Sequence, residues 1–467
     1  MQPTGVHVPV FLRKAVRMPY LYNYDVNAAT WFYLSLILIV AVFVRFTRVW
    51  SLRNLDLLLL LSISPGLLLV REGFDFGYVW LFAVTGLLLL RLFVDGLFER
   101  RPLLEQNMNA SGLAVLSISV FAFLMITAAT KPPPASAVQT VRRAAHLLNR
   151  EDTSSSQEEH VETGPASPLI AAGVVLPSNA VASGNGSLMQ QKGGTVLFAA
   201  RLMAILAHFA VVIGLILFGR CHFGNVQIGL AMATLYLLLP CTSYDVGRAN
   251  HVLPAALILW AFVAFRRPMV AGGLLGLACG TLFFPIFLLP LWAAFYGRRG
   301  AIRFGLALGI VAAVLLGSLV LTSADPDSFA KQTFGSIDWS VLTFHAIGSA
   351  AAGFWSTHDQ AFRIPVFVGF LLMLVVLTIW PRKKNLEHLI AHSTALVVGT
   401  QFWYPHQGGV YLLWYLPLLL MVVFRPRLMN LLPPDLTTSQ SEANQAADSK
   451  PTELASTVST AGGHLFH

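Results

Sequence analysis

Polar side chains able to bind or transform a ligand concentrate in one short turn, directly before an apolar stretch of the chain. The turn combines an acid, an arginine, an amide and an imidazole, supplied by Asp245, Arg248, Asn250 and His251. A carboxylate can take a proton as a general base, and an arginine can grip two oxygens of a phosphate. The turn is therefore the first candidate for a site.

The composition places this turn in a membrane protein. The 467 residues are 56% hydrophobic and only 11% charged, whereas about 25% of an ordinary soluble protein is charged. The net charge of +9 comes from Lys and Arg in short loops between apolar runs, a pattern that indicates membrane orientation rather than nucleic-acid binding. The three cysteines, Cys221, Cys241 and Cys279, form no CxxC pair, so neither a disulfide framework nor a zinc site is expected.

The apolar runs predict an all-α, polytopic transmembrane bundle with about 11 to 13 membrane segments. Residues 1–130 and 196–427 form two groups of such segments. Between them, residues 131–195 are rich in Pro, Ser, Glu and Gly, which predicts a flexible external loop with at most one short helix near 141–149. Residues 428–467 are predicted to be a disordered cytoplasmic tail, and no removable signal peptide is expected.

The basic clusters predict the topology. Arg266–Arg267, Arg298–Arg303, Arg382–Lys384 and Arg425 share one face if residues 268–297 enter the membrane and return. The positive-inside rule makes this face cytoplasmic, together with the C-terminus. The opposite, external face then receives the turn at 245–251, Arg71 to Asp75, the 131–194 loop and the segment at 403–408. These turns together could line a cavity at the external surface.

The stretch from 244 to 297 resembles a known family. Gly247-Arg-Ala-Asn, an apolar helix from Pro254, an arginine pair, the small-residue run from Ala271 and then Pro285 are similar to the polytopic GT-C glycosyltransferases, in particular their polyprenyl-phosphate-mannose-dependent alpha-mannosyltransferase branch. In that pattern a glutamine stands where this chain has Arg248, and a lysine precedes the proline.

The resemblance implies a GT-C-like bundle that transfers a mannose-like sugar from a polyprenyl-phosphate donor to an acceptor on the external face. It implies that an acid in an early external loop is the general base, for which Asp75 fits best, Glu72 second and Asp25 third. Substrate binding falls to Asp245, Arg248, Asn250, His251 and His406, with Arg248 on the lipid phosphate and Asn250 on a sugar hydroxyl. The partners are membrane lipids and the lipid-linked donor, without nucleic acid or cofactor; a divalent metal is left open.

Each candidate residue also has a plainer interpretation. Asp75 and Asn250 could cap helices, and Arg248 could anchor the chain at lipid headgroups. His251 and His406 could belong to a belt of interfacial residues beside Trp403 and Tyr404. The protein is expected in a bacterial-type inner membrane. The alternative functions are a transporter or flippase for lipid or polysaccharide precursors and a non-enzymatic membrane assembly protein.

Overall fold

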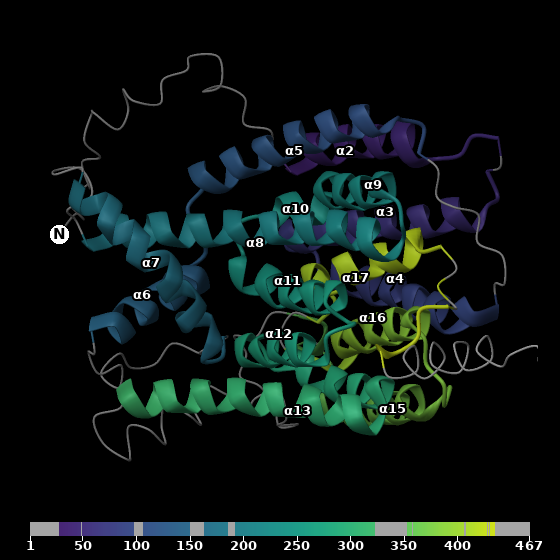
Figure 1. Ribbon diagram of the computed structural model, residues 1–467. Helices are drawn as coiled ribbons and strands as arrows, with labels where there is room; N and C mark the ends of the chain where they lie inside the picture. Colours follow the sequence, from purple (N-terminus) through teal and green to yellow (C-terminus); the bar gives the residue numbers. More distant parts are fainter. Residues whose placement is uncertain are drawn as a thin grey trace, which may run out of the picture.

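A computed structural model of the chain describes residues 28–47, 49–97, 106–149, 163–184, 192–322, 353–356, 358–405, 408–426, 428 and 430–434. Within these ranges the regular structure is entirely helical, with no strand, which confirms the predicted all-α class. The long helices lie side by side in a bundle, with α6 and α7 at one of its ends (Figure 1).

The helices follow one another with short connections, and those labelled η are 3₁₀-helices. In chain order they are α2 (Ala28–Phe43), α3 (Leu52–Arg71), α4 (Phe76–Phe93), η1 (Val94–Leu97), α5 (Ala110–Thr130), α6 (Ala135–Asn149), α7 (Ala166–Gly184), α8 (Lys192–His222), α9 (Val226–Leu238), α10 (Pro240–Tyr244), α11 (Ala249–Val263), α12 (Pro268–Thr281), η3 (Phe284–Leu288), α13 (Leu289–Thr322), η5 (Phe354–Ser356), η6 (Gln360–Phe362), α15 (Arg363–Ile379), α16 (Leu386–Trp403), η7 (Leu412–Trp414) and α17 (Leu416–Phe424).

Among the described residues, five segments are long and apolar enough to cross a bilayer: Leu52–Arg71, Phe76–Phe93, Ala110–Thr130, Gly194–His222 and Phe284–Leu321. A helix of about 20 residues rises about 30 Å, which matches the hydrocarbon core. Apolar side chains such as Leu58, Ile118 and Val314 point outward and are at least 60% exposed, as expected where lipid tails replace water. The chain is a polytopic membrane bundle.

The stretch at 268–297 enters the bundle and returns, as its flanking arginines predict. α12 leads away from the first arginine pair, and the return ends beside the starting point, because the Tyr296 hydroxyl donates to the Phe265 carbonyl over 2.7 Å. Gly297 then takes a left-handed φ of 66°, which kinks the chain before the rest of α13. The chain reversal therefore brings two arginine clusters to the same end.

Two further contacts show that other helices also end here. The last residues of α2 and α17 meet, with the rings of Phe43 and Phe424 6.1 Å apart. The last residues of α8 and α11 meet as well, with the Nε2 atom of His222 2.9 Å from the Val263 carbonyl oxygen. We call it the basic end, because the clusters Arg266–Arg267, Arg298–Arg299, Arg382–Lys384 and Arg425 gather there. The opposite end, called the cavity end, contains the C-terminus of α3, the α10–α11 turn and the helices α6 and α7 (Figure 1).

Two helices within 131–195 correct the prediction of a flexible loop: α6 contains the short helix expected near 141–149 and begins earlier, at Ala135, and α7 was not expected. α6 and α7 pack on α8 through small buried side chains, which are Ala137, Val141 and Ala144 of α6, Ala171 and Val175 of α7, and Ala199, Ala200, Met203 and Ala204 of α8. Alanines spaced three or four residues apart form an apolar stripe too weak to stand out against Pro- and Ser-rich flanks. The predictions for the N-terminal residues up to 27 and for the tail after 434 lie outside the described residues.

A buried charge network closes the basic end. Arg91 of α4 contacts Asp56 of α3 at 2.7 Å and Asp95 of η1 at 2.8 Å. Arg425, directly after α17, pairs with both Asp95 and Glu387 of α16. Since buried arginines need charged partners, the network links the chain after α17 directly to η1 and α16, and through Asp95 and Arg91 to α4 and α3.

Candidate functional site

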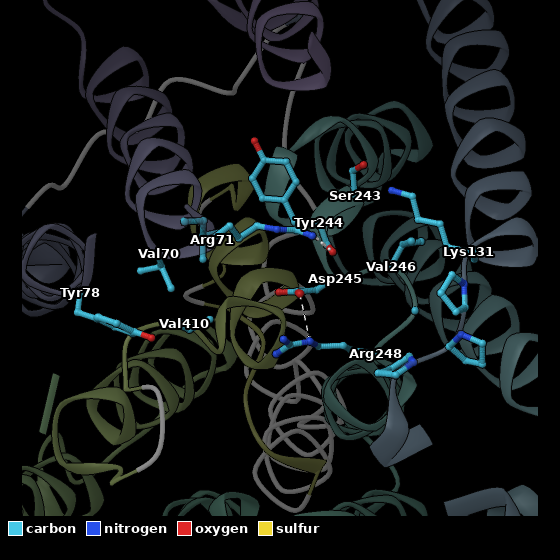
Figure 2. A pocket seen from close by; sticks show the side chains of 16 residues that line it. Val70, Arg71, Tyr78, Lys131, Ser243, Tyr244, Asp245, Val246, Arg248 and Val410 are labelled. Carbon is cyan, nitrogen blue, oxygen red and sulfur yellow. Dashed lines mark hydrogen bonds and ion pairs between the residues drawn. The ribbon is translucent and has the colours of Figure 1, made fainter. Parts of the chain in front are cut away.

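A cavity of about 540 Å³ opens at the cavity end (Figure 2). Its walls come from the ends of α3 and α5, the start of α4, a proline run, the α10–α11 turn and the segment before η7. The lining residues are Leu67, Val70, Arg71, Tyr78, Ala128, Lys131, Pro132, Pro133, Pro134, Ser243, Tyr244, Asp245, Val246, Gly247, Arg248 and Val410. The turn singled out in the sequence is thus one wall of a cavity.

The α10–α11 turn is built by local backbone bonds. Pro240 begins α10, which lasts only five residues. The Arg248 amide then donates to the Asp245 carbonyl over 2.9 Å, and the Ala249 amide donates to the Gly247 carbonyl over 3.0 Å. This tight turn places the two charged side chains together, with Arg248 Nε 3.2 Å from the Asp245 carboxylate.

Two further cations reach the cavity from other helices. Arg71, the last residue of α3, donates from Nη1 to the Tyr244 carbonyl over 3.2 Å and lies 5.3 Å from the centre of the Tyr244 ring. Lys131 follows α5 and lines the opposite wall (Figure 2). Arg71, Lys131 and Arg248 thus line the same cavity as a single lining carboxylate, Asp245. The excess of positive charge suits an anionic ligand such as a phosphate.

The Asp245 carboxyl is held in a partly desolvated position. Its side chain is only 19% exposed. Burial raises the pKa of Asp245 above its ordinary value, while the charges of Arg248 and Arg71 oppose that rise. A carboxylate with a raised pKa accepts a proton more readily than an exposed one. Asp245 is therefore a carboxyl group of raised pKa in the lining of the cavity.

The two acids predicted to be catalytic, Asp75 and Glu72, lie beside the cavity rather than in its lining. Both are exposed, in the connection between α3 and α4. Asp75 precedes α4 without a capping bond from its side chain, and its carbonyl accepts from the amide of Tyr78, a lining residue, over 3.0 Å. Both acids are thus near the rim.

Asn250 faces α6 instead of the cavity. Its side chain is 3% exposed, and its Nδ2 donates to the Thr140 hydroxyl over 3.3 Å. Asn250 is absent from the lining of the cavity, to which Arg248 belongs. Its observed contact holds α6 against α11.

His251 belongs to an aromatic cluster. Its ring stacks on Tyr411 and Trp414, with centroids 5.1 and 5.9 Å away. Trp414 Nε1 donates to His251 Nδ1 over 2.9 Å, so the second ring nitrogen carries the proton of the neutral imidazole. His406, the last predicted binding residue, lies outside the described residues.

Sequence reasoning missed Arg71 and Lys131 as site residues. A signal was present, because both are basic and both stand on the face opposite to the main arginine clusters. A basic residue that departs from the positive-inside rule needs an anionic partner or a functional reason. Which other turn each would meet depends on helix packing and is not contained in the local sequence. Within the described ranges, no group of His, Cys, Asp and Glu is arranged to hold a metal ion.

Comparison with known proteins adds one finding. Residues 168–402, half of the chain, match the model of glycosyltransferase family 87. The matched region contains the α10–α11 turn and the arginine-flanked hairpin, whereas Arg71 and Lys131 lie N-terminal to it. No curated protein and no solved structure matches the chain.

Proposed function

Because the chain belongs to glycosyltransferase family 87, we propose that this membrane glycosyltransferase takes its sugar from a polyprenyl-phosphate donor bound in the cavity. The observation that carries the proposal is that three cations, Arg71, Lys131 and Arg248, line one cavity that has a single lining carboxylate. A donor whose phosphate is attached to a lipid requires a site between transmembrane helices, whereas a soluble nucleotide donor does not.

In the proposed reaction the three cations stabilise the charge on the leaving phosphate. A sugar phosphodiester carries one negative charge, and the released phosphate monoester carries up to two, because its second pKa is about 6. Preformed cations stabilise this developing charge most strongly where water is partly excluded. The Arg248 guanidinium offers a planar pair of donors to the phosphate, and Arg71 and Lys131 add positive charge from the other walls.

Asp245 is the base that the geometry favours. In the transfer step the acceptor hydroxyl gives its proton to the carboxylate, and the acceptor oxygen bonds to the sugar C1. The bond from C1 to the phosphate oxygen breaks, and the phosphate leaves with the electron pair. Asp75 and Glu72, near the rim, are the second choice for the base, since they would need the acceptor to bind outside the cavity lining.

The proposal extends to the sugar and to the orientation in the membrane. Mannose is the sugar implied by the resemblance to GT-C alpha-mannosyltransferases. The positive-inside rule assigns the basic end and the C-terminus to the cytoplasm, so the cavity opens at the outer leaflet of a bacterial-type inner membrane. The donor then reaches the site from the plane of that leaflet.

The test uses purified protein in vesicles that contain polyprenyl-phosphate mannose labelled in the sugar, with a membrane extract as the source of acceptor. The wild type is expected to move label from the donor to a new product. Asp245→Asn should lower the rate at least 100-fold, in the range lost with a general base, whereas Asp75→Asn should retain it. The reverse pattern would make Asp75 the base.

The same vesicles separate an enzyme from a transporter. Label that crosses the bilayer while it stays on the donor would indicate a flippase. A wild type that neither transfers the sugar nor binds the donor would refute the proposal.

A further inference from the structure

His208 is an imidazole inside a membrane span with both of its ring nitrogens engaged. It lies on α8 and is 0% exposed. Its Nε2 is 3.1 Å from the Val246 carbonyl oxygen, and its Nδ1 is 2.9 Å from the Tyr236 hydroxyl. Val246 lies between Asp245 and Arg248 in the cavity turn (Figure 2). A buried side chain thus connects the middle of α8 with the turn.

The two partners determine the tautomer. A carbonyl oxygen only accepts hydrogen bonds, so Nε2 of a neutral imidazole must carry the proton that is donated to Val246. Nδ1 is then an acceptor, and the Tyr236 hydroxyl donates to it. Tyr236 is itself 1% exposed and its carbonyl accepts from the Thr242 hydroxyl over 2.6 Å. The segment from α9 to the turn is therefore held at both of its ends.

An apolar residue would fill this position in a membrane helix at lower cost, because a polar side chain inside a bilayer is unfavourable unless it has partners. The partner gained here is a carbonyl of the one turn that carries Asp245 and Arg248. We propose that His208 is a positioning residue that fixes the Val246 carbonyl and, through it, the relative placement of Asp245 and Arg248. The role in sugar transfer rests on the proposed function; the mechanical role does not.

The experiment compares two amides of different length. His208→Gln places an amide nitrogen near the Nε2 position and keeps a donor for Val246, whereas His208→Asn places it near Nδ1, too short to reach. Purified protein in nanodiscs is examined by hydrogen exchange of the peptide that contains residues 243–248, and by binding of decaprenyl phosphate. Folded amount is checked for each variant by size-exclusion chromatography.

His208→Asn should raise the exchange rate of the turn about tenfold and weaken decaprenyl phosphate binding about tenfold, the scale of one lost hydrogen bond. His208→Gln should stay within about threefold of the wild type in both measurements. Steady-state transfer should show a lower kcat for His208→Asn, because the charged pair is misplaced in the transition state. Unchanged exchange of the turn in folded His208→Asn would overturn the positioning role.

The two measurements distinguish the two proposals. Faster exchange with unchanged phosphate binding would keep His208 as the support of the turn and remove the turn from the donor site. If His208→Asn does not fold, Tyr236→Phe is used instead. It removes only the hydroxyl that donates to Nδ1, so that the proton of the imidazole is no longer fixed on Nε2. It should increase exchange of the turn in the same direction but less, and no increase would overturn the positioning role.

Discussion

The guanidinium of Arg248 lies 3.2 Å from the carboxylate of Asp245, and only Val246 and Gly247 separate them in the chain. The pair joins a cation suited to phosphate with a base suited to a hydroxyl. Because both residues line one cavity, a single turn can stabilise the leaving phosphate through Arg248 and deprotonate the acceptor hydroxyl through Asp245.

The pH dependence of transfer should report on this pair. Burial raises the pKa of Asp245 above 3.8, and Arg248 opposes the rise. The base is active when deprotonated, so the rate should fall as the pH drops through this raised pKa. Arg248→Gln removes the opposing charge, which raises the pKa further and should move the acid limb of the kcat profile to higher pH. An acid limb that stays in place would show that Asp245 is not the titrating base.

The charge network at the basic end should dominate local stability. Asp95→Ala leaves the buried Arg91 and Arg425 without the carboxylate that they share. The free energy of unfolding should decrease by about 3 to 5 kcal/mol, as for other broken buried ion pairs. Urea unfolding in detergent measures it, with the exposed Asp75→Ala as the control, expected within about 0.5 kcal/mol of wild type. Equal losses in both variants would contradict a special role for the network.

Helix α7 should be required for accumulation of the protein. Ala171 and Val175 are buried against its neighbours, so deletion of residues 166–184 exposes apolar surface on α6 and α8. The amount of membrane-embedded protein should fall at least fivefold, because loss of this helical packing destabilises the protein more than most single substitutions do. The amount is quantified by fluorescence of a C-terminal fusion. Deletion of residues 152–160, which lie between α6 and α7 in the sequence, is the matched control. Normal accumulation without α7 would show that its packing is dispensable.

Topology can be tested independently of activity. Reporter fusions after residues 380 and 427 should both read cytoplasmic, because they follow basic clusters. A reporter inserted at 187 should read external. A cytoplasmic signal at 187 would put the cavity on the wrong side for an outer-leaflet donor and would invert the proposed orientation.

The sequence predicted features that are local or periodic. The membrane class and the hairpin at 268–297 follow from apolar runs and arginine spacing within short stretches. Of the turn predicted at 245–251, Asp245 and Arg248 line the cavity, whereas Asn250 and His251 do not. Arg71 was missed because its partner, the Tyr244 carbonyl, lies far away in the sequence. α7 and the first turns of α6 were missed because their apolar stripes consist largely of alanine. The direction of Asn250 toward Thr140 depends on how α6 packs against α11, which a local sequence pattern does not specify.

The most direct measurement of the central claim is binding of decaprenyl phosphate to the purified protein in nanodiscs. Arg248→Ala and Arg71→Ala should each weaken binding about tenfold or more, as expected for lost charge-assisted hydrogen bonds. Arg248→Lys should also weaken it, because the planar fork is lost, and Arg248→Gln should be milder than Ala if hydrogen bonding dominates. The control is Arg299→Ala, an exposed arginine at the basic end, which should bind like the wild type. Equal affinity in all five variants would contradict a phosphate site in the cavity.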